Sequence, residues 1–106
     1  MKAYIAGKIT GDPNYREKFQ KGAEALQRAG YTVLTPATLP NGMRNSDYMR
    51  ICFAMIDVAD IVFFLPDWQK SPGARLEHMY CDYINKVTLE LYKMPQYQEV
   101  IAEEEE

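Results

Sequence analysis

The continuous apolar run Ile61-Val62-Phe63-Phe64-Leu65 is followed by a turn over residues 66–70 and then by the pair Ser71-Pro72. An apolar run without polar interruption is typical of a central strand in a parallel sheet that helices cover on both faces. A serine followed by proline predicts a helix start, because the serine side chain caps free amides and the fixed φ of proline suits the first helical position. The predicted helix runs to about Tyr83, so this stretch is a strand–turn–helix unit.

The segments on either side repeat this alternation. Strands are predicted over 2–6, 31–35 and 87–91, a helix from Asp12-Pro13 to Gly30, another from Ser46 to Ala59, and a short amphipathic helix after Lys93. The order βαβαβαβ predicts a single α/β domain with a doubly wound, flavodoxin- or Rossmann-like, mostly parallel sheet of four to five strands. The domain is expected over 1–92 and a C-terminal extension over 93–106. Ligands bind such sheets at the carboxyl ends of the strands, which directs attention to loops 7–14, 36–45 and 66–72.

Composition excludes several classes of protein. The chain has 106 residues, 47% hydrophobic and 25% charged, which is ordinary for one soluble globular domain. Four of its acidic residues form the run 103–106, expected to be a disordered tail, and the rest carries about one net positive charge, unlike a protein that binds polymeric nucleic acid. No apolar run approaches the ~20 residues of a membrane span, so a cytoplasmic location is expected. Two distant cysteines and one histidine predict no disulfide framework, metal or cofactor.

The helix that begins at Ser71 can form a binding site. A helix amino terminus attracts anions, and the Ser71 hydroxyl with the amides of Gly73, Ala74 and Arg75 can hold a phosphate or carboxylate. Glu77 lies on the same face as Gly73 and Ala74, and its side chain leans toward the amino terminus, over two small residues that leave room for a ligand. Spacing alone fits equally a helix packed through small residues with Glu77 in solvent.

Three motifs make the interpretation more specific. They are Tyr4-Ile5-Ala6-Gly7-Lys8-Ile9-Thr10-Gly11, Ala59-Asp60-Ile61-Val62-Phe63 and Ser71-x-Gly73-x-x-x-Glu77. In this order, over 4–91, they resemble the nucleoside 2-deoxyribosyltransferase-like family, which includes deoxynucleoside-monophosphate N-glycosidases. With Trp68, the chain is most similar to a small uncharacterised branch of that family.

The resemblance implies cleavage of an N-glycosidic bond in a nucleoside or deoxynucleoside monophosphate through a covalent glycosyl intermediate on Glu77. Tyr4 is expected to position Glu77 as the second catalytic residue, and Trp68 either stacks on a base or serves packing or a subunit contact. The substrate-binding residues implied are Gly7, Lys8, Asp67, Trp68, Ser71, Gly73, Ala74 and Arg75. The expected partners are a small-molecule nucleoside or nucleotide and further copies of the chain in a homo-oligomer, a dimer or higher.

One position departs from the family pattern. Cys52 stands near the place where relatives carry an aspartate that handles the leaving base, and a thiol of ordinary pKa does not exchange protons at neutral pH as a carboxylate does. Asp57 or Asp67 can take that role, or the chain is a nucleotide-binding module without turnover. A phospho-acceptor signalling domain is disfavoured, because Gly7-Lys8 stands where its paired acids belong. His78 is expected at the surface, about 100° around the helix from Glu77.

Overall fold

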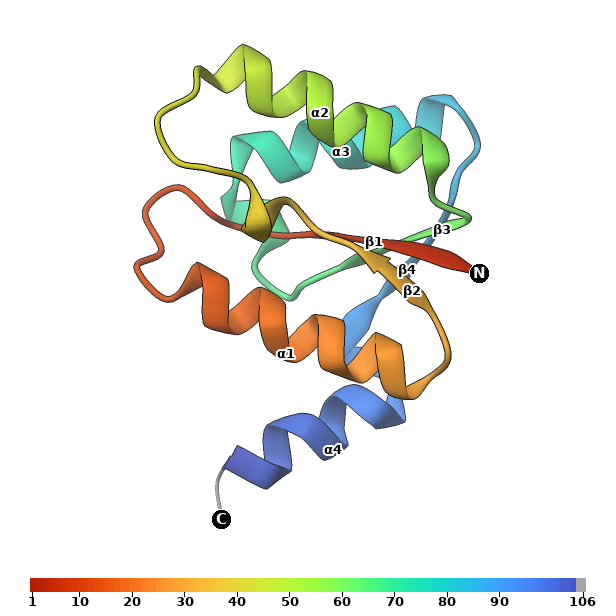
Figure 1. Ribbon diagram of the computed structural model, residues 1–106. Helices are drawn as coiled ribbons and strands as arrows, with labels where there is room; N and C mark the ends of the chain where they lie inside the picture. The colour runs from red at the N-terminus through yellow and green to blue at the C-terminus, as the bar shows by residue number, and fades with distance from the viewer. Residues whose placement is uncertain (105–106) are drawn as a thin grey trace.

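The computed structural model describes residues 1–104 and consists of a four-stranded parallel sheet between two layers of helices (Figure 1). The strands are β1 (Lys2–Ala6), β2 (Thr32–Leu34), β3 (Ile61–Phe64) and β4 (Val87–Glu90), in the order β2-β1-β3-β4. All three strand pairs are parallel, with Ala3 opposite Ile61 and Ile61 opposite Val87. The expected doubly wound, flavodoxin-like α/β domain is confirmed, with four strands.

The helices divide evenly between the two faces of the sheet. Helices α1 (Tyr15–Arg28) and α4 (Pro95–Glu104) cover one face, and α2 (Asn45–Val58) and α3 (Pro72–Tyr83) cover the other (Figure 1). Three short 3-10 helices, at Pro36–Thr38, Trp68–Lys70 and Leu91–Lys93, occupy segments predicted as loop or turn, or left between two elements. No helix among residues 1–104 is long and apolar enough to cross a membrane.

Side-chain alternation along the central strands supplies both cores. Ala3, Ile5 and Phe63 face α1 and α4, where they meet Phe19 and Leu26. The other face carries a second buried cluster under α2 and α3, whose members are Tyr4, Ala6, Cys52, Ile56, Ala59, Val62, Phe64 and Cys81. Each cluster contains one phenol, Tyr97 in the first and Tyr4 in the second, but only the second contains thiols, those of Cys52 and Cys81.

Two helix starts differ from the prediction by one or two residues. Helix α1 begins at Tyr15 instead of Pro13, because the Asp12 carboxylate accepts a hydrogen bond from the amide of Asn14 and forms a turn before the helix. Helix α2 begins at Asn45, where the side chain of Asp47 accepts from the amide of Arg44 and caps the first turn without Ser46.

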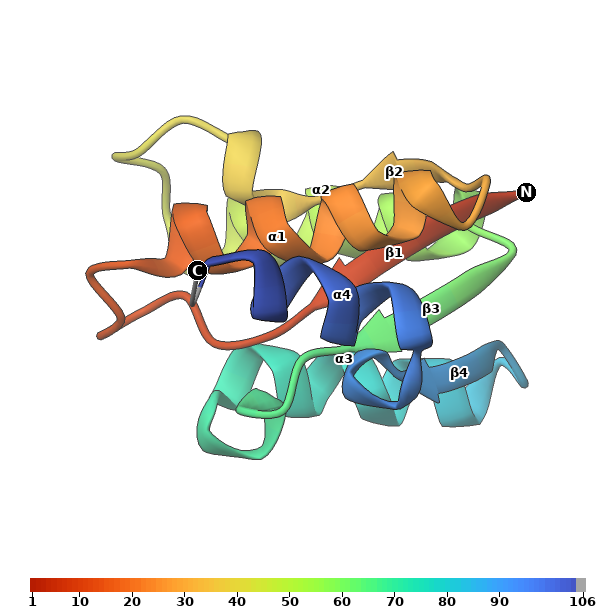
Figure 2. The same ribbon diagram turned by 90° about the horizontal axis from the view of Figure 1, so that it is seen from below.

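The short amphipathic helix expected after Lys93 is present, and it extends into the acidic run that was expected to be disordered. Residues 95–104 form α4, which lies along α1 (Figure 2) and contributes Tyr97 and Val100 to the first core. Glu103 pairs with Arg28 at 2.6 Å and Glu104 pairs with Lys21, so the expectation of disorder is wrong for these two residues. Glu105 and Glu106 lie outside the described residues. The acidic run belongs in part to the fold because α1 offers it complementary charges.

Candidate active site

The candidate site lies where β1 and β3 end side by side, at the point where the strand order reverses. The segments after β1, β2 and β3 gather at this end of the molecule, on the left in Figure 1. The amide of Leu65 donates to the carbonyl of Ala6 at 2.8 Å. A Cβ atom at Gly7 would lie 2.7 Å from Cδ1 of Leu65, so a larger residue would push the two strand ends apart. Gly7 therefore sets the close approach of the two segments.

Lys18 of α1 joins these two segments, although no sequence motif marks it. Its Nζ lies 2.7 Å from the carbonyl oxygen of Lys8 and 2.5 Å from carboxylate oxygens of both Asp12 and Asp67. The other oxygen of Asp67 accepts from the amide of Lys8 at 3.0 Å. The hydrogen bond from Lys18 is the main reason that the pKa of Asp12 falls below its ordinary value. Both oxygens of Asp67, an expected substrate ligand, thus already accept hydrogen bonds from the protein.

The start of α3 follows the prediction. Ser71 caps the helix by accepting a hydrogen bond from the amide of Ala74 at 3.1 Å, and Pro72 occupies the first helical position. A Cβ atom at Gly73 would have two near neighbours in residues 1–104, Sδ of Met49 at 3.7 Å and Oγ of Ser71 at 3.9 Å. Both are ordinary contact distances. The side chain of Glu77 therefore leaves space above Gly73, and Met49 from α2 borders that space. Met49 has no local sequence signal, because α2 and α3 meet only in the folded chain.

Glu77 points from α3 toward the sheet and meets Tyr4 of β1. The Tyr4 hydroxyl donates to Oε1 of Glu77 at 2.5 Å, across 73 positions of sequence. Tyr4 is fully buried and Glu77 is 6% exposed, the only polar or charged residue in the buried set among residues 1–104. The structure thus brings together the two residues expected to be catalytic.

Burial controls the protonation of this cluster. Desolvation raises the pKa of Glu77 to about 7, although the Tyr4 hydrogen bond opposes that rise. Desolvation likewise raises the pKa of Tyr4, with the charge of Glu77 as a second cause. Cys52 and Cys81 are buried in the same cluster, and desolvation raises the pKa of each thiol to about 11. At neutral pH the Glu77 carboxyl group is therefore about half ionised, and the phenol and thiols around it are neutral.

The two oxygens of Glu77 differ. Every fully buried side-chain nitrogen and oxygen in residues 1–104 has a hydrogen-bond partner. Oε1 accepts from Tyr4, whereas Oε2 takes part in none of the side-chain hydrogen bonds among these residues. The carboxylate is therefore held at one oxygen and leaves the other without a hydrogen bond from residues 1–104, which is the arrangement that a nucleophile or a proton acceptor requires.

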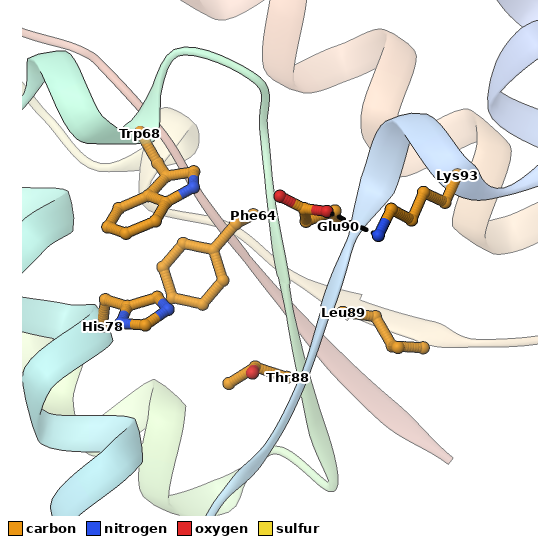
Figure 3. Close-up of a pocket in the computed structure, with 7 residues that line it drawn as sticks. All are labelled: Phe64, Trp68, His78, Thr88, Leu89, Glu90 and Lys93. Carbon is orange, nitrogen blue, oxygen red and sulfur yellow. Dashed lines mark ion pairs between the residues drawn. The ribbon is translucent and has the colours of Figure 1, made fainter.

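Trp68 packs against other aromatic rings at the edge of the site. Its indole stacks on the His78 imidazole with ring centroids 4.3 Å apart and planes 5° apart, and the Phe64 ring lies beside both, tilted by 58° to each. These three residues form one side of a concavity of about 230 Å³ (Figure 3). On its other side Glu90 and Lys93 form an ion pair at 2.9 Å. Glu77 does not line this concavity. His78 was expected at the surface, and its side chain is about one-third exposed. It also stacks on Trp68, which was not expected.

The remaining expected site residues take separate positions. Ala74 is buried at the start of α3, while Arg75 is exposed and points away from Glu77, about 200° around the helix. Lys8 contributes its backbone to the network around Lys18, and its side chain is half-buried. Asp57, considered as a substitute acid, is exposed on α2, where its carboxylate accepts from the Tyr80 hydroxyl at 2.6 Å. Among residues 1–104 no group of three or more His, Cys, Asp or Glu is arranged to hold a metal ion.

Comparison with known proteins gives a family without a function. No curated protein matches the chain. The model of the family described as a domain of unknown function, DUF4406, matches residues 1–90, from the start of the chain through β4 and including Tyr4 and Glu77. The chain is therefore a member of the DUF4406 family.

Proposed function

We propose that this protein cleaves the N-glycosidic bond of a 2′-deoxynucleoside or its monophosphate, with Glu77 as the nucleophile. The observation that carries the proposal is the pair formed by Tyr4 and Glu77. It holds one carboxylate oxygen by a 2.5 Å hydrogen bond and leaves the other without a hydrogen-bond partner among residues 1–104, on the helix that follows β3, whose end lies where this fold binds ligands. The resemblance of the three sequence motifs to the nucleoside 2-deoxyribosyltransferase-like family supplies the substrate class.

The reaction proceeds in two displacements. Oε2 of Glu77 attacks C1′ of the sugar, the bond from C1′ to the base nitrogen breaks, and its electron pair leaves with the base, which takes a proton from water. A glycosyl ester of Glu77 results. Water then attacks C1′, gives up a proton to solvent and restores the carboxylate, whereas attack by a second base gives transfer. Two inversions retain the configuration at C1′.

A phosphate site at the start of α3 fits this substrate. The Ser71 oxygen accepts from the amide of Ala74, so the hydroxyl proton remains to donate to an anion. The helix dipole adds partial positive charge at the same place. Gly73 lies between Ser71 and the space above Glu77, which allows a sugar to lie between a 5′-phosphate and the carboxylate.

A second candidate is a nucleotide-binding module without turnover. Cys52 stands where the related enzymes carry an acid, and burial raises the pKa of its thiol to about 11. Neither aspartate considered as a substitute is free, because Asp57 lies on the outer surface of α2 and Asp67 is bonded to Lys18. Under this alternative the pocket binds a nucleotide and the base stays attached.

One experiment separates the two candidates. The protein is incubated with the four deoxynucleoside monophosphates and the parent nucleosides, and released base is measured by chromatography. We expect base release that is lost in Glu77→Ala and retained in Glu99→Ala, a matched change at an exposed glutamate of α4. Because the nucleophile must be ionised, the rate should rise with pH and level off above about 7.

The outcomes are distinct. Base release at an unchanged rate in Glu77→Ala contradicts the nucleophile assignment. Nucleotide binding with no release from any substrate favours the binding module. An intact-mass increase of one deoxyribosyl unit that requires Glu77 supports the covalent intermediate directly.

A further inference from the structure

The outer face of α3 is apolar. Leu76, Met79 and Tyr83 are 50%, 66% and 88% exposed, and their spacing places them on one side of the helix, opposite the buried Glu77. A helix that covers a sheet ordinarily turns charged and polar residues to this side. Three large apolar side chains in one row form a surface that a partner covers.

The charges beside this row have an unusual order. Arg75 lies in the first turn of α3 and Asp82 in the last, seven residues later on the same flank of the apolar row. The helix dipole favours the opposite order, with acids first and bases last. Arg75 forms no ion pair among residues 1–104, and the Asp82 carboxylate meets only His78, at 3.5 Å. Both charges are therefore unfavourable for α3 alone.

The neighbouring helix repeats this order in part. Arg50 and Asp57 are exposed on α2 and are also seven residues apart, with the base nearer the amino end. The two helices run side by side in one layer (Figure 1), and Phe53 stacks on Tyr80 between them with ring centroids 4.4 Å apart. Asp47 in the first turn of α2 and Lys86 beside Asp57 balance this order on α2, so the reversed order is complete on α3 alone.

We propose that the outer face of α3 binds a second copy of this chain, with the two α3 helices antiparallel about a two-fold axis near Met79. This axis places Arg75 of each copy opposite Asp82 of the other and packs the Leu76 and Tyr83 side chains around the two Met79 residues. A surface that carries both charges in this order is complementary to itself when reversed, which is the property of an isologous interface. The inference does not depend on catalysis at Glu77.

The competing arrangement uses the free edge of the sheet. Strand β4 has one neighbour, and Val87 and Leu89 on it are 59% and 50% exposed. Pairing of two β4 strands about Thr88 would extend the sheet across two copies. Strand β4 lacks the reversed charge order of α3, so α3 is the preferred surface, and the two arrangements predict different cross-links.

Sedimentation over a range of protein concentrations tests whether the full chain dimerises through α3. We expect twice the mass of one chain for the wild-type protein and for Val58→Glu, a control at a 55% exposed residue of α2. Met79→Glu places two like charges at the axis and should sediment as a monomer. Arg75→Asp should weaken dimerisation about tenfold or more, and the double variant Arg75→Asp with Asp82→Arg should restore it, because the pair is re-formed with its signs exchanged.

Cross-linking then locates the axis. Cys52 and Cys81 are buried, so a single added surface cysteine reports the contact. Met79→Cys should form a disulfide-linked dimer under mild oxidation, and Thr88→Cys should not. A monomeric wild-type protein at all concentrations, a cross-link at position 88 without one at 79, or failure of the charge exchange to restore the dimer would each overturn the proposal.

Discussion

Helices α1 and α3 cover opposite faces of the same sheet and follow opposite rules of burial. Helix α1 buries Phe19, Ala23 and Leu26 and exposes most of its charged residues. Helix α3 buries Glu77 between Ala74 and Cys81, and exposes Leu76, Met79 and Tyr83. The first arrangement is what the hydrophobic effect alone produces, whereas the second places a carboxyl group in the core and hydrocarbon in water.

The difference is what we expect if α1 serves stability and α3 carries the proposed site and the proposed contact surface. A buried carboxyl group with a raised pKa destabilises the ionised protein, so its presence needs a reason other than folding. Substitutions on the inner faces of the two helices should therefore have effects of opposite sign.

The largest effect is expected from Phe19→Ala on α1. Phe19 is fully buried against the first core, and truncation of such a side chain costs about 3–5 kcal/mol of the free energy of unfolding. Urea denaturation measures the change, with Gln20→Ala on the exposed side of α1 as the control. If Phe19→Ala does not fold, Phe19→Leu should still fold and lose about 1 kcal/mol. A cost near zero in both variants would contradict the assignment of α1 to the core.

Glu77→Gln on α3 should instead stabilise the protein, by an amount that grows as the pH rises from about 4.5 to about 7 and then levels off. The folded-state pKa of about 7 exceeds the ordinary 4.5, so the stability that protonated Glu77 confers is fully present below pH 4.5 and is lost as pH rises through 7. Glutamine stays neutral and still accepts the Tyr4 hydrogen bond. Between pH 5 and pH 8 the variant should gain about 2–3 kcal/mol relative to the wild-type protein.

Denaturation curves at pH 5 and pH 8 for both proteins measure this gain, and their difference cancels the titration of all other groups. Equal stability differences at the two pH values would mean that Glu77 is ionised in the folded protein at pH 5. The same variant should release no base, which separates its stability from its activity.

Tyr4→Phe should have the smallest effect of the three. It removes the hydroxyl that holds Oε1, and loss of a hydrogen bond to a charged group costs about 1.5–3 kcal/mol at pH 8, with about 1 kcal/mol at pH 5, where Glu77 is protonated. Because Tyr4 lowers the pKa of Glu77, its removal should move the pH at which base release levels off to a higher value. An unchanged pH profile would show that Tyr4 does not act on Glu77.

Local signals predicted most of the fold. Each of these signals is contained in a few neighbouring residues: the apolar run before Pro66, the pair Ser71-Pro72 and the glycine at 30. The strand and the helices that they predict are present. The errors lie where a local signal has two outcomes. Asp12 caps a turn in place of the helix, and the acidic residues Glu103 and Glu104 became helical because α1 presents Arg28 and Lys21.

For the candidate site, the sequence predicted only how residues on a single helix lie relative to one another. The spacing of Gly73, Ala74 and Glu77 follows from helix geometry, and the pairing of Tyr4 with Glu77 was expected solely through the family resemblance. Lys18 and Met49 gave no signal, because the residues they meet lie on other elements, and the stacking of Trp68 on His78 joins a loop to a helix.

By itself, then, the sequence determined which segments are strands and helices, where α3 begins and which of its residues share a face with Glu77. These properties depend on caps, prolines and periodicity, whose reach is one or two helical turns. Only the tertiary structure decided that Glu77 is buried against Tyr4, that Lys18 joins two loops, and that Leu76, Met79 and Tyr83 remain uncovered. Burial and its consequences for pKa arise from contacts between distant segments, which a local pattern does not specify.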